Sequence, residues 1–250
     1  MKPGAPELRI DGAVATLTLR RPQQANRLEA ADLLTISEHV ARVNATAQVL
    51  VLRIEADGRT FCAGYDIGSI ASTRTVAFED MVNALEDARP VTMALLQGGV
   101  YGGATDLALA CDFRLGSTAT EMFMPAAHLG LHFYRRGLER YVSRLGVDQA
   151  KRLLLTAERI DAGEMRAIGF LTHLVAGDAL TSTADRLAAT LAGMAPLALL
   201  GMKKHLNRIA RGTLDADELA RDIERAAASR DLQEGRMAWA EKRAPRFSGD

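Results

Sequence analysis

Residues 98–112 read GGVYGGATDLALACD, and no other segment is as informative about the fold of this chain. An apolar, strand-like run at 91–96 leads into the glycines, which then open into a helix of small residues. Glycine allows tight turns and lets a ligand approach the main chain closely. The free N–H groups at the start of a helix, with the positive end of its dipole, can hold an anion or an oxyanion.

A second glycine turn, FCAGYDI at 61–67, follows another β-rich run at 49–54. Two backbone N–H donors, one from each turn, that point at the same oxygen would stabilise an enolate or a tetrahedral oxyanion. Either turn alone is a weak signal. The pair predicts a site built on main-chain hydrogen-bond donors.

Length and composition are those of a globular α/β protein. The chain has 250 residues, of which 48% are hydrophobic and 25% charged, enough for a full core. Its 31 basic and 31 acidic residues leave no net charge, which argues against nucleic acid or an anionic membrane as a partner. We expect Cys62 and Cys111 to be reduced and buried. The N-terminus lacks the apolar core of a signal peptide, so the expected location is the cytoplasm.

Hydrophobic spacing predicts alternating strands and helices up to residue 175 and only helices from residue 181 onward. The expected strands cover residues 13–20, 49–54, 91–96, 113–115, 121–124 and 171–175, and the expected helices 28–43, 81–88, 137–145, 149–156, 181–193, 196–210 and 214–242. This order predicts an α/β core at 1–193 and a helical region at 194–250. Apolar stripes in the helical region, with members such as Leu206 and Ile223, exceed what one core needs to cover.

The two glycine turns and the segments at 24–28, 125–130, 155–175 and 241–247 resemble the crotonase superfamily, the enoyl-CoA hydratase/isomerase family. The resemblance covers essentially the whole chain. It implies a spiral of ββα turns and a C-terminal helical region that assembles a homotrimer or a dimer of trimers. It also implies an acyl-CoA substrate, no separate cofactor because coenzyme A is part of that substrate, and no metal.

The same resemblance assigns site residues. By their positions in the family motifs, Tyr65 and Gly103 would donate the two N–H groups to the thioester oxygen. CoA would bind along a further set of residues, the last two from a neighbouring subunit: Gln24, Asn26, Arg27, Ala63, Gly64, Asp66, Ile67, Gly102, Lys242 and Phe247.

The acid–base positions depart from the family pattern. Family hydratases place two glutamates beside the reacting carbons, and these positions are occupied here by Asp106 and Ala126. A shorter carboxylate and a missing second one argue against ordinary hydration by a glutamate pair. His132 and Tyr134, in the loop after Gly130, are the candidates for replacement acid–base groups.

Several alternatives stay open at this level. Asp106 could cap or ion-pair within its helix, and His132 could be an ordinary loop residue. The leading hypothesis is an acyl-CoA enzyme that stabilises a thioester enolate. The alternatives are a lyase similar to methylmalonyl-CoA decarboxylase, whose reaction needs the enolate site but no base, a degenerate family member that binds acyl-CoA without turnover, and a CoA-independent β-diketone hydrolase.

Overall fold

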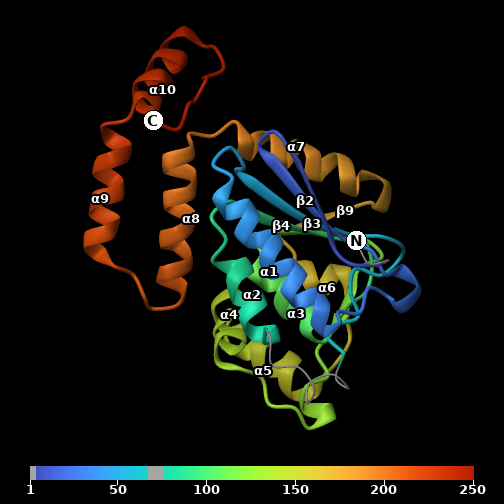
Figure 1. Cartoon of the computed structure of the whole chain (residues 1–250). Coiled ribbons are helices and arrows are strands. Elements are labelled where there is room, and N and C mark those ends of the chain that lie inside the picture. Colours follow the sequence, from blue (N-terminus) through green and yellow to red (C-terminus); the bar gives the residue numbers. More distant parts are fainter. Residues whose placement is uncertain (1–3, 67–75) are drawn as a thin grey trace.

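Figure 1 shows the fold in a computed structural model, which describes residues 4–66 and 76–250. Within these residues the larger sheet has six strands in the order β1-β2-β3-β4-β6-β9, and a smaller sheet has the order β5-β7-β8. The strands are β1 (Glu7–Asp11), β2 (Val14–Leu19), β3 (Val51–Ala56), β4 (Val91–Leu96), β5 (Val100–Tyr101), β6 (Phe113–Ser117), β7 (Glu121–Phe123), β8 (Ile160–Asp161) and β9 (His173–Val175).

The helices fill the connections between strands and then form the C-terminal region. They are α1 (Ala30–Ala45), α2 (Phe78–Glu86), α3 (Gly103–Ala110), α4 (Arg135–Leu145), α5 (Val147–Thr156), α6 (Ala162–Ala167), α7 (Leu180–Ala192), α8 (Pro196–Ala210), α9 (Ala216–Ala227) and α10 (Arg230–Glu241). Short 3-10 helices cover Pro22–Gln24, Ala127–Leu129 and Gly177–Ala179.

The chain advances as a spiral. β4 lies in the larger sheet and the following strand β5 in the smaller one, after which α3 leads to β6 in the larger sheet and β7 in the smaller one. Apart from the β1–β2 hairpin, neighbouring strands of the larger sheet are parallel. The predicted spiral of ββα turns is therefore confirmed.

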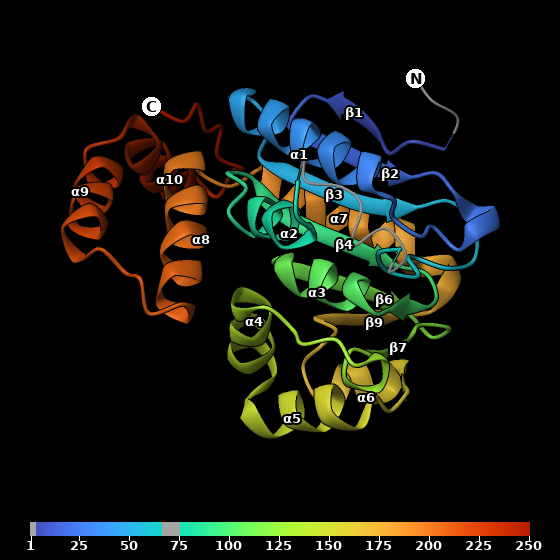
Figure 2. The same cartoon turned by 60° about the horizontal axis from the view of Figure 1, so that its bottom comes forward.

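The larger sheet is covered on both faces, which explains why β4 is apolar at nearly every position. All six residues of β4 are buried. Val91, Met93 and Leu95 pack in the cluster that includes α7, whereas Ala94 and Leu96 pack in the main core. Figure 2 shows α1, α2 and α3 on one side of this sheet and α7 on the other.

The C-terminal helices α8, α9 and α10 stand to one side of the sheets (Figures 1 and 2). Lys203 on α8 connects them to the core through its buried ammonium group, whose Nζ donates to the carbonyls of Ala88 (2.7 Å) and Pro90 and lies 3.0 Å from Asp112 Oδ2. A lysine is buried in this way only where its charge and its donors are satisfied.

Several details differ from the sequence prediction. The prediction of a single helix over 214–242 is wrong, because the helix is interrupted between α9 and α10. Ser229 lies at this interruption, and its Oγ accepts from the N–H of Leu232 and caps α10. The strands β1, β5 and β8 were not predicted: β1 lies at a sheet edge and alternates only between half-buried and exposed residues, and β5 and β8 are two residues long. Cys62 and Cys111 are free and buried, as expected. No helix of the described residues is long and apolar enough to cross a bilayer.

Candidate active site

The two glycine turns lie side by side and are joined by main-chain hydrogen bonds. The N–H of Cys62 donates to the carbonyl of Gly99 (3.2 Å), and the N–H of Tyr101 donates to the carbonyl of Cys62 (3.0 Å). The turn at 61–66 is thereby fixed in register against residues 99–103, which continue directly into α3.

Only glycine fits where the turns touch. Gly64 has φ +92°, and a Cβ added to it would lie 2.7 Å from the carbonyl oxygen of Tyr101 and 3.2 Å from the nitrogen of Gly103. Both the backbone conformation and the close approach exclude a side chain. The absence of that Cβ brings the backbone of residues 64 and 65 next to the first N–H of α3.

Two N–H groups at this contact have no acceptor among the described residues. The hydrogen bonds on either side of Tyr65 run from the N–H of Leu28 to Gly64 and from the N–H of Asp66 to Leu28, and they leave the N–H of Tyr65 unused. Gly103 is the first residue of α3, so its N–H has no partner within the helix. Two free donors beside a helix N-terminus can hold a negatively charged oxygen.

The Cys62 thiol forms hydrogen bonds to two segments at the first turn. Its Sγ lies 3.1 Å from the carbonyl oxygen of Asn26, to which it donates, and accepts from the N–H of Gly64 at 3.4 Å. Burial raises the pKa of Cys62 to about 12, so the sulfur stays a neutral thiol. Sequence reasoning predicted its burial but not its place between two segments of the turn.

The candidate CoA-binding residues fall into one neighbourhood near the first turn. The N–H of Ala63 donates to the carbonyl of Ala25, and Arg27 lies 3.6 Å from Asp66 in an ion pair. These contacts bring together the predicted residues Gln24, Asn26, Arg27, Ala63, Gly64 and Asp66, and Gly102 lies across the contact between the turns. Ile67 lies outside the described residues.

Asn26 differs from the other residues of this group because its side chain is already used. It is buried, its Oδ1 accepts from the N–H of Arg21 (2.8 Å), and its Nδ2 donates to the carbonyls of Asp57 and Thr60 (both 2.8 Å). This side chain shapes the loop beside Gln24 and Arg27, which are exposed.

The carboxylate of Asp106 is fully buried and bound by two other side chains. Arg140 donates from Nε to Oδ1 (2.8 Å) and from Nη2 to Oδ2 (2.6 Å), and the hydroxyl of Tyr134 also donates to Oδ2. Such a forked guanidinium–carboxylate pair is among the strongest polar contacts in proteins. Both oxygens of Asp106 are therefore occupied.

Arg140 is in turn held by Glu86 and Asn83 on α2. Its Nη1 lies 3.1 Å from Glu86 Oε2 and 3.0 Å from Asn83 Oδ1. Glu86 also receives Arg136 and Arg211, the latter at the C-terminal end of α8. Burial lowers the pKa of Arg140, but the hydrogen bond and charge of Asp106 outweigh it and raise that pKa above its ordinary value.

Sequence reasoning missed Arg140 and Glu86. The available signal was the buried face of α4, which is formed by Gly137, Arg140 and Tyr141. An arginine at an otherwise apolar, buried spacing implies a buried partner. The sequence could not show that this partner is Asp106.

Of the loop candidates, the structure brings Tyr134 to Asp106 but leaves His132 apart from it. His132 is exposed, and its Nδ1 lies 2.7 Å from the carbonyl oxygen of Phe133. Tyr134 lies among aromatic rings, with Phe133 at 4.6 Å and Phe78 at 6.4 Å between ring centroids. Phe78 also covers Gly103, since a Cβ there would lie 2.7 Å from its ring.

Ala126 gives the second acid–base position no ionisable group. It is buried at the start of the 3-10 helix Ala127–Leu129, and its carbonyl accepts from the N–H groups of Leu129 and Leu131. Its neighbour Pro125 lies beside the second turn, with Cδ 4.0 Å from the position of a Cβ on Gly102. The position is next to the turn but carries only a methyl group.

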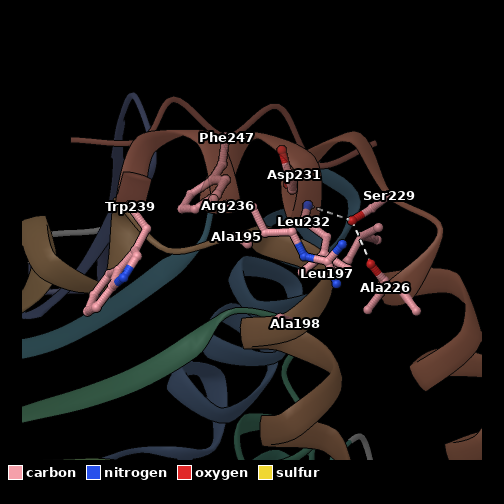
Figure 3. Close-up of a pocket in the computed structure, with 12 residues that line it drawn as sticks. Ala195, Leu197, Ala198, Ala226, Ser229, Asp231, Leu232, Arg236, Trp239 and Phe247 are labelled. Atoms are coloured by element: carbon pink, nitrogen blue, oxygen red, sulfur yellow. Dashed lines mark hydrogen bonds between the residues drawn. The ribbon is translucent and has the colours of Figure 1, made fainter. Parts of the chain in front are cut away.

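Lys242 and Phe247 lie in the C-terminal helical region of their own chain. Lys242 ends α10 in a left-handed conformation, and Phe247 lines an apolar cavity of ≈ 630 Å³ between α8, α9 and α10. Figure 3 shows Phe247 and Trp239 among the residues that line this cavity, together with Ser229, whose Oγ caps α10. No hydrogen bond or ion pair of the described residues links Lys242 or Phe247 to the glycine turns of the same chain.

Among residues 4–66 and 76–250, no group of three or more histidine, cysteine, aspartate or glutamate side chains is placed to hold a metal ion.

The sequence matches the family model described as enoyl-CoA hydratase/isomerase over residues 9–250. It is 30% identical over 257 residues to the human mitochondrial enoyl-CoA hydratase domain-containing protein 2, covering 96% of this chain and 87% of that protein. It is 28% identical over 250 residues to the 2,3-dehydroadipyl-CoA hydratase of Escherichia coli K12, covering 94% and 95% of the two chains. The crystal structure of an enoyl-CoA hydratase from Bacillus anthracis superposes with a TM-score of 0.85 at 26% identity, covering 98% of this chain and 99% of that one. The chain is therefore a member of the enoyl-CoA hydratase/isomerase family, whose enzymes act on acyl-CoA thioesters and typically need no separate cofactor.

Proposed function

We propose that this protein binds an acyl-CoA thioester and stabilises its enolate with the N–H groups of Tyr65 and Gly103. The observation that carries the proposal is the contact between the two turns, where a Cβ on Gly64 would lie 3.2 Å from the nitrogen of Gly103 and the N–H of Tyr65 has no acceptor among the described residues. Removing a proton or a carboxylate from the α carbon of a thioester places negative charge on the carbonyl oxygen. Preorganised donors at that oxygen supply the largest single share of catalysis in comparable sites.

The side chains that flank these donors argue against water activation by a glutamate pair. Asp106 is already bound by Arg140 and Tyr134, and Ala126 has no proton to transfer. We infer that Asp106 acts in the site by holding Tyr134 rather than as a free base. His132, exposed in the neighbouring loop, stays a candidate proton carrier for a bound substrate.

Decarboxylation of a malonyl-type thioester is the second candidate function. Ala126 favours it, because loss of carbon dioxide generates the enolate without a base and needs no second carboxylate. A family member that binds acyl-CoA without turnover is the third, on the same observation.

We further propose that the protein assembles as a homotrimer or a dimer of trimers, which would let Lys242 and Phe247 complete the CoA pocket of a neighbour. Support comes from large apolar side chains that stay exposed on the C-terminal helices, among them Leu206 (65%), Ile223 (60%) and Trp239 (88%). Exposed apolar surface of this kind marks an interface. Light scattering at micromolar concentration that gives a monomer would contradict this assembly.

The test of the catalytic proposal is a product panel with matched variants at Gly103. The purified protein is incubated with enoyl-, 3-hydroxyacyl- and malonyl-type CoA thioesters, and products are identified by mass spectrometry. Gly103→Pro removes the N–H at the first helical position, where proline is tolerated, and should lower kcat about 10²–10³-fold. Gly103→Ala presses a similar Cβ against Phe78 but keeps the N–H, so it isolates the donor from the steric effect.

The outcomes separate the candidates. Hydration or isomerisation products identify an enoyl-CoA enzyme, and loss of carbon dioxide identifies the lyase. Binding without any product identifies the inactive member. If Gly103→Pro folds and turns over as fast as Gly103→Ala, the assignment of the N–H donor is wrong.

A further inference from the structure

The peptide unit between Gly102 and Gly103 carries the N–H that the proposed function directs at the thioester oxygen. In a planar trans peptide the C=O and N–H groups point in opposite directions, so the direction of the Gly102 carbonyl fixes that of the Gly103 N–H. The space around Gly102 is open: its φ is +55°, and an added Cβ would meet only Pro125 Cδ, at 4.0 Å, among the described residues. The orientation of this peptide therefore depends on hydrogen bonds rather than on packing around Gly102.

Thr105, the third residue of α3, binds the Gly102 carbonyl twice. Its N–H donates to that oxygen at 3.0 Å, and its hydroxyl donates from Oγ1 at 2.6 Å. On the other side of the same glycine, the N–H of Gly102 donates to the carbonyl of Phe123 (3.0 Å). The Gly102 carbonyl is thereby held toward the body of α3, and the N–H of Gly103 points out of its N-terminal end.

Tyr141 on α4 adds a further hydrogen bond behind Thr105. The two hydroxyl oxygens lie 2.5 Å apart, and both side chains are fully buried. A threonine hydroxyl has one hydrogen, which here goes to the Gly102 carbonyl, because a carbonyl can only accept. Tyr141 is therefore the donor to Thr105. Burial raises the pKa of Tyr141 above its ordinary value, so the phenol keeps its hydrogen.

These contacts form one hydrogen-bond chain with a single direction. It runs from the phenol of Tyr141 to the hydroxyl of Thr105, from there to the carbonyl of Gly102, and through the peptide unit to the N–H of Gly103. Hydrogen bonds in a low-dielectric interior polarise one another, and each is strengthened by about 10–30% by its neighbour. Because electron density is drawn toward the Gly102 oxygen, the N–H of the same peptide becomes a stronger donor.

We propose that Thr105 and Tyr141 are positioning residues of the oxyanion site, which orient and polarise the Gly102–Gly103 peptide without touching the substrate. The inference rests on the proposed function, because it takes the N–H of Gly103 as a donor to the thioester oxygen. A polarised donor gains more from a charged oxygen than from a neutral one. The hydrogen-bond chain should therefore favour an enolate over the neutral thioester.

The experiment measures how much enolate the protein stabilises. The probe is acetoacetyl-CoA, a 3-ketoacyl thioester whose enolate absorbs in the near ultraviolet, and mass spectrometry checks that it stays intact. At a pH where the free probe is mainly the keto form, the wild type should raise the enolate-to-keto ratio of the bound probe. Calorimetry with butyryl-CoA, which forms no such enolate, measures binding of the neutral carbonyl.

Tyr141→Phe deletes one hydroxyl, while the ion pair of Asp106 with Arg140 continues to join α3 and α4. One donor is worth about 10²–10³-fold in comparable sites, so losing about 10–30% of its contribution should lower the enolate-to-keto ratio about two- to eightfold. The affinity for butyryl-CoA should change less than about twofold, because its oxygen stays neutral. A side chain that only stabilised the fold would change both measurements alike.

Variants at position 105 test the order of the chain. Thr105→Ser keeps the hydroxyl and should retain the wild-type ratio, whereas Thr105→Val removes it and should lower the ratio more than Tyr141→Phe. In the Thr105→Val background, Tyr141→Phe should have no further effect, because the chain is already interrupted. Thr120→Val is the matched control and should leave the ratio unchanged. Thr120 is also buried and also donates to a carbonyl, that of Leu96, outside the two glycine turns.

Two results would overturn the inference. One is a wild-type enolate-to-keto ratio in folded Tyr141→Phe, and the other is an equal loss of enolate and of butyryl-CoA affinity. If Tyr141→Phe or Thr105→Val does not fold, the other variant decides. The proposed function fails separately: a wild type that does not raise the ratio, or equal ratios in Gly103→Pro and Gly103→Ala, would contradict the donor assignment itself.

Discussion

Replacing Arg140 by methionine tests how strongly the ionic network holds Asp106. Methionine keeps much of the apolar stem of arginine, but it leaves a carboxylate without exposed surface, for which Tyr134 is the remaining side-chain donor among the described residues. Removing one partner of a buried ion pair costs about 3–5 kcal/mol, because the other charge stays buried and unpaired. Since domains are stable by about 5–15 kcal/mol, a loss of this size should shift the unfolding midpoint clearly.

The assay is urea unfolding followed by circular dichroism, with the slope of the transition compared between variants. We expect Arg140→Met to lose about 3–5 kcal/mol at pH 7. The double variant Asp106→Asn/Arg140→Met removes both charges and should recover most of the loss. If Arg140→Met costs less than about 1 kcal/mol, as an exposed ion pair would, the buried contact does not hold Asp106.

Three further outcomes follow from the site. Gly64→Ala should lower turnover at least tenfold, since its Cβ would lie 2.7 Å from Tyr101 O, whereas Gly130→Ala, with φ +72° but open space, should cost stability only. Equal kcat values in the two variants would contradict the steric argument. Iodoacetamide at pH 8 should leave Cys62 and Cys111 unlabelled in the folded protein and label both in urea, because burial raises both pKa values to about 12. Each thiol therefore favours the folded state below its unfolded pKa of about 8.5, and the free energy of unfolding should fall as the pH rises toward 12. Ala126→Glu should raise crotonyl-CoA hydration above the wild-type rate, and an unchanged rate in a folded variant would show that position 126 does not face the acyl chain.

The larger features of the fold could be predicted because they are local. β4 is an apolar run interrupted only by Thr92, and its ends match the prediction from the sequence. The glycines could be assigned to turns because Gly64 and Gly102 have positive φ values that other residues rarely adopt. The break at Ser229 was harder to predict, since helical spacing continues across it and only a capping serine marks the new start.

The sequence predicted the main-chain part of the candidate site, which is the pair of glycine turns, better than its side chains. The two glycine turns follow from their sequence, whereas the N–H groups of Tyr65 and Gly103 were assigned as donors by the resemblance to the family, and this assignment stays a prediction. The sequence identified Asp106 as a candidate but could not show its ion pair. Its partner Arg140 lies on another helix and is brought to it by tertiary packing. Whether a carboxylate is a free base or a buried counter-ion depends on such a partner.

The division between backbone and side chains also explains how this site can depart from a glutamate pair without losing its central chemistry. The proposed oxyanion donors need only Gly64, Gly103 and the start of α3, and no substitution at positions 106 or 126 removes them. The chemistry at the β carbon depends instead on side chains, and there Arg140 neutralises one carboxylate while Ala126 replaces the other. Tyr134 and Arg140 both donate to the carboxylate of Asp106. The ion pairs of Arg140 with Asp106 and Glu86 continue to Arg211 at the C-terminal end of α8, so a chain of charged groups connects Asp106 to the C-terminal helices.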